Sequence, residues 1–275
     1  MASITGNLDN PFILAIETSG RLGSVALAQG DKLLAESRFS GPMRHSAEIF
    51  PAITDLLNKF SKKPDQIEHV YISVGPGSFT GLRIAVTLAK TLALANGTKI
   101  VAVDTLDCIA ANVINFTAWL GHPCPGEHAE NAEKNIIKNN LCGLSGENSR
   151  LAVILDAKRG QFFIAVYDRT MKGWEKMFPD SLLTAEEFLD RFASCGKPTC
   201  GERSRTIALI GEGLVFYKHK FNDPAVQFPD EKYWNPSAIN VHKLGWELAK
   251  NGQFADPLTL IPNYIRGPDA IVKQR

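Results

Sequence analysis

Short apolar runs separated by turn residues open the chain and predict three antiparallel strands. The first run, Phe12 to Glu17, reads F-I-L-A-I-E and is followed by the turn T-S-G-R-L-G. Two further strands are expected over Ser24 to Ala28 and over Lys32 to Phe39. The Q-G-D between them is a hairpin signal. The opening of the chain is therefore predicted to form a three-stranded meander.

Helical spacing begins after this meander. From His45 to Phe60 apolar residues recur on one helical face, and Ser46 is a candidate N-cap. The elements expected next are a strand over Ile67 to Val74, a helix over Leu82 to Ala95 ended by Asn96-Gly97, a strand over Lys99 to Val103 and a helix over Thr105 to Leu120. The predicted order of elements in the first 120 residues is βββαβαβα.

The composition of the chain changes at residue 121. Residues 121–150 are polar and lack apolar periodicity, which indicates an insertion or linker. The order of elements favours two α/β lobes, residues 1–120 and 151–275. In the second lobe we expect strands over Leu151 to Leu155, Phe162 to Tyr167 and Thr206 to Ile210, helices over Thr184 to Phe192 and Ser237 to Lys250, and a polar insertion over Cys195 to Arg205.

Composition and charge narrow the class of protein. The 275 residues are 44% hydrophobic and 21% charged, and the net charge of +1 gives no overall attraction to nucleic acid or membrane. No apolar run reaches the length of a membrane span, and the N-terminus does not read as a signal peptide. Five scattered cysteines predict free thiols in a reducing cytoplasm. His122, Cys124, His128 and Cys142 are candidates for a metal site, although the sequence favours a solvated loop there.

The loop G-P-G-S-F-T-G-L-R, which starts at Gly75, raises the question of phosphate binding. A P-loop requires a lysine, and this loop has none. Thr80 stands where the dinucleotide fingerprint needs its third glycine. Gly75, Gly77, Ser78 and Thr80 are nevertheless candidates for weak nucleotide binding, because backbone amides at a helix start attract anions. The alternative is a tight turn with hydroxyl caps and no ligand.

The helix after this loop is more apolar than a surface helix needs to be. Arg83, Thr87, Lys90 and Thr91 form one narrow polar stripe, and apolar or small residues cover about 200° of the remaining circumference. Ala85 begins a row of alanines four residues apart that lets another helix approach closely. Either a neighbour inside the lobe or a partner subunit accounts for this excess.

Candidate catalytic groups are few. No helix carries an H-x-x-x-H or H-E-x-x-H pair, and Ser78 has no histidine at a motif-like spacing. Glu17 is a candidate for holding a metal-bound water, although no second ligand stands near it in sequence. Asp156 is expected to form a turn with an ion pair to Lys158 or Arg159.

Five stretches, taken in order, resemble one family. They are L-A-I-E-T-S-G-R-L-G-S-V-A-L, R-H-S-A-E-I-F-P-A-I, S-V-G-P-G-S-F-T-G-L-R-I-A-V, L-D-A-K-R-G-Q-F-F-I-A-V-Y and P-N-Y-I-R. The chain is similar to the bacterial tRNA threonylcarbamoyladenosine biosynthesis proteins of the TsaB, or YeaZ, family. The resemblance implies an α/β, two-lobed actin-like/Hsp70-like ATPase fold, in which each lobe is a mixed sheet flanked by helices.

The resemblance also implies a role without catalysis of its own. Such proteins pair with a catalytic paralogue, TsaD, which transfers the threonylcarbamoyl group to the tRNA adenosine next to the anticodon. A small ATPase, TsaE, docks on that pair. In this chain Thr105 and Ile109 stand near the positions of the paralogue's metal-binding histidines. The tRNA is then bound mainly by the partner, and no cofactor is required.

Family members associate through the two helices of the first lobe, as homodimers when alone and with TsaD when it is present. The interface residues implied here are Ile49, Ile53, Leu82, Ala85, Val86, Ala89 and Ala93. Two alternatives stay open. One is an ATPase or peptidase of the same superfamily that acts alone through Glu17 or Ser78. The other is a nucleotide-sensing module.

Overall fold

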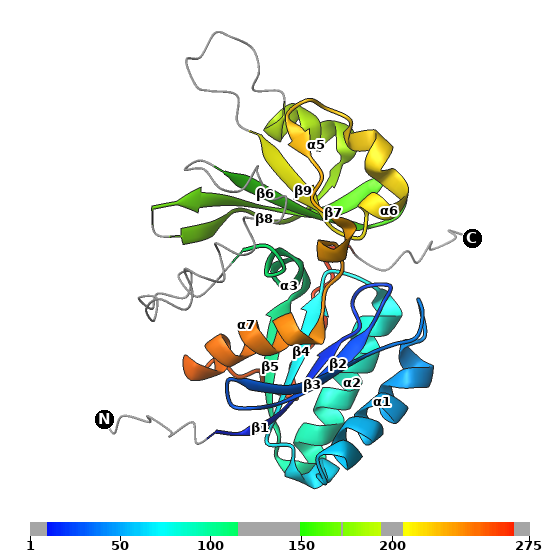
Figure 1. Cartoon of the computed structure of the whole chain (residues 1–275), viewed down its shortest axis with the longest axis vertical. Helices are drawn as coiled ribbons and strands as arrows, with labels where there is room; N and C mark the ends of the chain where they lie inside the picture. Colours follow the sequence, from blue (N-terminus) through cyan, green and yellow to red (C-terminus); the bar gives the residue numbers. More distant parts are fainter. Residues whose placement is uncertain (1–9, 115–148, 172, 194–205, 267–275) are drawn as a thin grey trace, which may run out of the picture.

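The chain folds into two lobes stacked along its longest axis (Figure 1). The computed structural model describes residues 10–114, 149–171, 173–193 and 206–266. Several predicted features lie outside these residues. They are the second polar insertion, the first one except for its last two residues, the later part of the helix predicted over Thr105 to Leu120, and the four candidate metal ligands. The lobe boundaries therefore stay predictions.

The first lobe is a five-stranded mixed sheet with helices on both faces. Its elements are β1 (Phe12–Glu17), β2 (Ser24–Gln29), β3 (Lys32–Arg38), α1 (His45–Lys59), a 3-10 turn (Pro64–Gln66), β4 (His69–Gly75), α2 (Phe79–Asn96), β5 (Lys99–Asp104) and α3 (Thr105–Ala110). The strand order is β3-β2-β1-β4-β5, with β1 to β3 antiparallel and β4 and β5 parallel to β1. The predicted meander and the order βββαβαβα are confirmed.

The second lobe repeats this topology. Its elements are β6 (Arg150–Asp156), β7 (Gln161–Thr170), β8 (Gly173–Thr184), α5 (Ala185–Phe192), β9 (Ile207–Ile210), α6 (Leu214–Tyr217), a 3-10 turn (Lys218–Phe221), β10 (Val226–Gln227), a 3-10 turn (Glu231–Tyr233) and α7 (Ala238–Lys250). The order β10-β9-β6-β7-β8 matches the first sheet strand for strand, with the same parallel and antiparallel pairs.

Helix ends agree with most of the local sequence signals. Gly97 ends α2 in the left-handed conformation, as expected. Thr184 and Ser237 stand at the starts of two predicted helices, and each is the N-cap of the observed helix, α5 or α7. The predicted cap Ser46 is wrong, because α1 begins one residue earlier and has Arg44 at its N-cap position. Strand β8 is not predicted by the sequence pattern, because G-W-E-K-M-F-P-D-S-L-L-T is polar and contains a proline, which is tolerated at the edge of a sheet.

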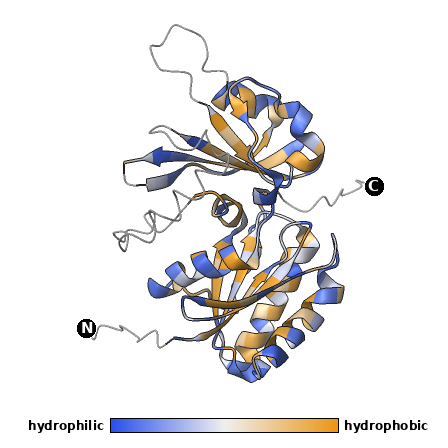
Figure 2. Cartoon of the chain, in the orientation of Figure 1, coloured by the Kyte–Doolittle hydropathy of each residue, from blue (hydrophilic) through white to orange (hydrophobic). Residues whose placement is uncertain are grey.

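Two helices, α7 and α3, each contact the sheet of the other lobe. Helix α7, which comes after the second sheet in sequence, packs on β1 to β5 of the first sheet, on the face opposite α1 and α2 (Figure 1). Helix α3 contacts β4 and β5 of its own sheet and also β6 of the other. The central strands of both sheets are the most hydrophobic parts of the molecule (Figure 2). No helix in the described part of the chain is long and apolar enough to cross a membrane.

Candidate functional site

The glycine loop packs directly on the turn after β1. A Cβ atom on Gly77 would lie 2.5 Å from the Ser19 carbonyl oxygen, and one on Gly81 only 1.8 Å from that of Thr18. Ser78 donates its backbone N–H to the Ser19 carbonyl over 2.7 Å, and the Thr18 hydroxyl donates to the Gly81 carbonyl over 2.8 Å. These glycines are therefore needed for close backbone contact, whether or not an anion binds.

The four residues predicted for nucleotide binding have different surroundings. Gly77 and Ser78 line a cleft between the lobes, and Ser78 is the N-cap of α2. Gly75 is buried at a φ of +118°, with the Asn263 carbonyl 2.9 Å from where a Cβ would stand. Thr80 is exposed on α2 and does not line the cleft. The loop thus contributes one glycine and one hydroxyl to the cleft.

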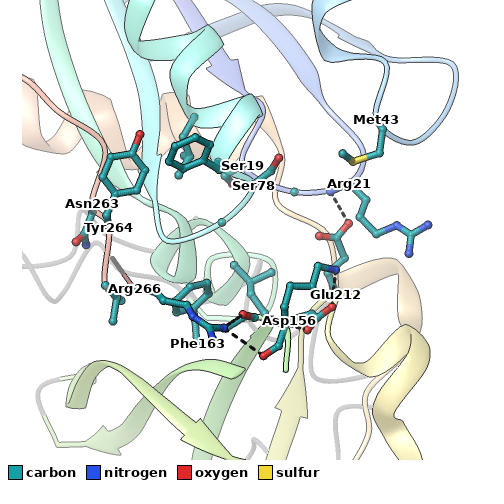
Figure 3. A pocket seen from close by; sticks show the side chains of 18 of the residues that line it. Ser19, Arg21, Met43, Ser78, Asp156, Phe163, Glu212, Asn263, Tyr264 and Arg266 are labelled. Atoms are coloured by element: carbon teal, nitrogen blue, oxygen red, sulfur yellow. Dashed lines mark hydrogen bonds and ion pairs between the residues drawn. The ribbon is translucent and has the colours of Figure 1, made fainter. Parts of the chain in front are cut away.

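The cleft has a volume of about 770 Å³ and is walled by both lobes and by the C-terminal segment (Figure 3). Its charged side chains are Arg21, Lys158, Arg266, Asp156 and Glu212. Its aromatic side chains are Phe79, Phe163, Phe216, Tyr217 and Tyr264. A cavity of this size and mixed lining can hold a small polar ligand with an aromatic part.

Glu17 is fully buried at the end of β1 and is hydrogen-bonded to Ser19, which lines the cleft. One carboxylate oxygen, Oε1, accepts hydrogen bonds from the Ser19 hydroxyl at 2.5 Å and the Ser19 amide at 2.6 Å. The other, Oε2, has no partner in normal hydrogen-bond geometry within the described part of the chain. Burial raises the pKa of Glu17, although its bonds to Ser19 oppose that shift. Because Glu17 is absent from the cleft lining, it supports Ser19 and does not face a ligand directly.

Glu212 is the buried acid among the side chains that line the cleft. It accepts a hydrogen bond from the Arg21 backbone N–H at 2.5 Å, which joins the second lobe to the first (Figure 3). Burial raises the pKa of Glu212 to about 7. The Arg21 guanidinium lies 4.6 Å from the centre of the Phe216 ring, across the same junction.

The turn between β6 and β7 forms the opposite wall. Lys158 and Asp156 form an ion pair of 2.8 Å, as predicted for this turn. Lys158 and Arg159 have positive φ angles of +66° and +56°, which are uncommon for residues with long side chains. The backbone of this turn is therefore held in its shape by its surroundings.

The residues implied for the partner interface are mostly buried within the single chain. Of the seven, Ile49, Ile53, Leu82, Ala85, Val86 and Ala89 are all at most 8% exposed and belong to the core of the first lobe or line its cleft, and only Ala93 is half-buried. The broad apolar arc of α2 is thus explained mainly by a neighbour inside the lobe, because the sheet and α1 both pack against it.

Other residues of the same helices do reach the surface. Phe50 on α1 is 59% exposed, and Leu94 on α2 is 71% exposed. Ile84, Leu88 and Leu92, four residues apart along α2, are half-buried. Side chains of this size facing water form a surface on which another protein can pack.

A charged cluster that the sequence pattern does not indicate lies where α3 meets the second sheet. The Lys176 ammonium is 2.7 Å from carboxylate oxygens of both Asp107 and Asp180, and 3.8 Å from Asp104. The Tyr167 hydroxyl donates to Asp107 over 2.7 Å. Burial and the neighbouring Asp107 raise the pKa of Asp104 well above its usual value. Burial lowers the pKa of Lys176, but the three carboxylates outweigh it and raise that pKa.

The positions related to the paralogue's histidines are enclosed. Thr105 and Ile109 are fully buried in α3. Among the described residues there is no group of three or more histidine, cysteine, aspartate or glutamate side chains placed to hold a metal ion.

Known proteins resemble this chain both in part and as a whole. The family model described as "TsaD: tRNA N6-adenosine threonylcarbamoyltransferase" matches residues 41–122. The protein of Bacillus subtilis named "tRNA threonylcarbamoyladenosine biosynthesis protein TsaB" is 29% identical over 95% of this chain and 96% of its own length. The protein of that name from Buchnera aphidicola subsp. Baizongia pistaciae is 30% identical over 80% of this chain and 86% of its own length.

The solved structure of YeaZ from Pseudomonas aeruginosa has the same fold, with a TM-score of 0.64, 19% identity, and coverage of 92% of this chain and 99% of that one. The duplicated sheets, the crossing helices and the cleft between the lobes define a protein of the actin-like/Hsp70-like ATPase fold. Within that class, the chain belongs to the TsaB family.

Proposed function

We propose that this chain acts in the biosynthesis of threonylcarbamoyladenosine in tRNA, as a non-catalytic subunit that binds and activates a TsaD-like catalytic paralogue. Similarity to the Bacillus subtilis protein of that pathway name over 95% of the chain supports the pathway. The match of residues 41–122 to the transferase family model supports a common origin of the two proteins' first lobes. Related lobes can pair through equivalent helices.

The observation that carries the pairing is the set of apolar side chains left at the surface of α1 and α2. Phe50 and Leu94 are more than half exposed, and the row formed by Ile84, Leu88 and Leu92 is incompletely covered. A partner helix laid on this row would remove its half-exposed side chains from water and stabilise the complex. Leu94 stands beside Thr87, Lys90 and Thr91 on the adjoining face of α2, at the edge of that contact. We extend the proposal to a homodimer when the chain is alone, to a TsaE-like ATPase on the pair, and to tRNA bound only through the partner.

The test measures mass by light scattering for the chain alone and mixed with the TsaD-like protein of the same genome. Phe50→Glu and Leu94→Glu should together weaken association about tenfold, because each places a charge within or beside an apolar contact. Met171→Glu, at a fully exposed methionine of the second lobe, is the matched control and should bind as wild type does. A variant such as Ala89→Arg is unsuitable, because Ala89 is fully buried and its replacement would disturb the fold.

Failure of wild type to associate with that protein at micromolar concentration would reject the partner role. Thermal unfolding of each variant must remain cooperative, with an unchanged midpoint, for a loss of binding to count. Phe50 and Leu94 are exposed in the single chain, so their replacement should meet this condition.

The cleft supports a second candidate, which is weak nucleotide binding without turnover. Its volume of about 770 Å³ is within the range of small-molecule sites, and it combines basic and aromatic side chains. Equilibrium dialysis with ATP tests binding, and phosphate release tests turnover. Hydrolysis of ATP or peptide that is lost in Glu17→Ala or Ser78→Ala would instead favour an enzyme that acts alone.

A further inference from the structure

The segment from Ala255 to Arg266, which we name the tail strap, runs along the first lobe and ends in the cleft. Ala255 donates its backbone N–H to the Ile100 carbonyl at 2.8 Å, on the edge strand β5. Leu260 packs on the core of the first lobe. Asn263 then donates to the carbonyl of Val74, at the end of β4, over 2.7 Å. The strap is thus anchored to the first lobe at both ends of that stretch.

The next strap residue, Tyr264, contacts the first turns of α2. Its ring centre lies 5.2 Å from that of Phe79, and its hydroxyl accepts a hydrogen bond from Arg83 Nε at 3.1 Å. The Arg83 guanidinium lies 3.7 Å from the centre of the Phe79 ring. These three side chains form one exposed cluster at the start of α2.

Arg266 reaches across the cleft to the second lobe (Figure 3). Its Nη1 donates to the Ala157 carbonyl at 2.6 Å and lies 3.4 Å from the Lys158 carbonyl. Both acceptors belong to the turn that holds Lys158 and Arg159 at positive φ. Charge-assisted hydrogen bonds of this kind are stronger than neutral ones. The strap therefore contacts α2 and the second lobe through residues only two positions apart.

That spacing limits how far the strap can stretch. Two extended residues span at most about 7 Å, so the backbone between Tyr264 and Arg266 cannot lengthen by more than a few ångströms. If the cleft opens further, either the hydrogen bonds of Arg266 break or Tyr264 is pulled from Phe79 and Arg83. The position of the second lobe and the packing at the start of α2 are therefore not independent.

We propose that Arg266 is a positioning residue through which the opening of the cleft controls the start of α2. Through that helix it controls the α1–α2 docking surface, which comprises the exposed or half-buried Phe50, Ile84, Leu88, Leu92 and Leu94. This inference rests on the proposed function for its final step only. With Arg266 bound to the β6–β7 turn, Tyr264 holds Phe79 and Arg83 in place and the helix start is ordered. When that contact is lost, the cluster loosens and the docking surface binds its partner less tightly.

The experiment measures amide hydrogen exchange by mass spectrometry in the full chain, for wild type and Arg266→Ala. Exchange over residues 79–84 should accelerate about fivefold or more, which is the lower end of typical coupling between sites. The hydrogen bonds that the substitution removes are those to the β6–β7 turn of the second lobe. Arg38→Ala removes an exposed arginine of β3, paired with Glu36, and is the matched control. It should leave residues 79–84 unchanged.

A second background isolates the route. In Tyr264→Ala, which removes the link to Phe79 and Arg83, adding Arg266→Ala should produce no further acceleration over residues 79–84. Faster exchange confined to residues 157–161 in Arg266→Ala would overturn the inference. So would additive effects of the two substitutions.

Partner affinity tests the last step separately. Arg266→Ala should bind the TsaD-like protein about fivefold more weakly than wild type, and equal affinity would overturn control of the docking surface. If wild type does not bind that protein at all, the proposed function fails. The hydrogen-exchange result then still decides whether the strap couples the cleft to α2.

Discussion

The two lobes share a strand order but differ in the helices that come after corresponding strands. Strand β4 leads into α2, a helix of 18 residues, whereas the corresponding strand β9 leads into α6, a helix of four residues. The long helix covers its own sheet and still presents Leu94 and its neighbours to solvent. The short helix instead places Phe216 and Tyr217 on the wall of the cleft. One sheet architecture thus supports a surface helix in one lobe and a cleft wall in the other.

The turns after β1 and after β6 also correspond between the lobes, and they differ in the burial and pairing of their acidic residue. Glu17 ends β1 fully buried, with a raised pKa, whereas Asp156 ends β6 partly exposed and paired with Lys158. Close glycine contacts are common to both lobes. Cβ atoms on Gly81 and Gly211 would lie 1.8 and 2.1 Å from the carbonyl oxygens of Thr18 and Ile154. Close backbone packing at the end of the first strand is therefore shared, and the charges around it are not.

The largest effect is expected where the two lobes meet. Lys176→Met leaves the buried Asp107 and the partly buried Asp104 and Asp180 without their cation, which should lower the free energy of unfolding by about 3–5 kcal/mol. Urea unfolding followed by tryptophan fluorescence measures the change. Lys232→Met, at an exposed pair with Asp230, is the control and should leave the midpoint unchanged. A Lys176→Met protein as stable as wild type would show that the cluster does not join the lobes.

A smaller effect separates glycines needed for close packing from glycines needed for their backbone angle. Gly81→Ala should cost about 3 kcal/mol, because the new Cβ meets the Thr18 carbonyl and the backbone must shift. Gly97→Ala has open space but a φ of +71°, so it should cost only about 1 kcal/mol. Chemical denaturation of both variants gives the two values. Equal costs would mean that the contact between the glycine loop and the β1–β2 turn relaxes easily.

An effect smaller than that of Gly81→Ala concerns the buried acid of the second lobe. The folded-state pKa of Glu212, about 7, lies above its ordinary value of 4.5, so the stability that protonated Glu212 contributes is complete below pH 4.5 and is lost as pH rises toward 7. This change amounts to about 2 kcal/mol, allowing for relaxation around the carboxylate. Glu212→Gln should remove it and flatten the stability–pH profile in that window. An unchanged slope in Glu212→Gln would place the titration on another group.

The order and type of most elements could be predicted from local pattern alone. Apolar periodicity marked the face of α1, and Thr184, Ser237 and Gly97 marked helix ends, because caps and turns depend on residues close in sequence. The sequence pattern did not predict strand β8, because a strand at the edge of a sheet does not need an apolar face. The glycine loop and the Asp156 turn were recognisable as features, but their contacts were not.

The candidate site shows the same division. The sequence indicated Gly77 and Ser78, which do line the cleft, but not Glu212 or Arg266, which complete it from the other lobe and the tail strap. No local signal predicts that Lys176 meets Asp107, because ion pairs between distant residues exist only once both sheets have formed.

By itself, the sequence determined most of the strands, the amphipathic helices, the tight turns and a resemblance to one family, because these depend on short-range periodicity and ordered motifs. Only the tertiary structure decided that the arc of α2 faces its own lobe, that α7 returns to the first sheet and that the tail strap joins α2 to the second lobe. The physical reason is that the sequence around an apolar residue does not specify which surface will cover it. That surface is set by long-range strand pairing and by the close backbone contacts that bring the lobes together.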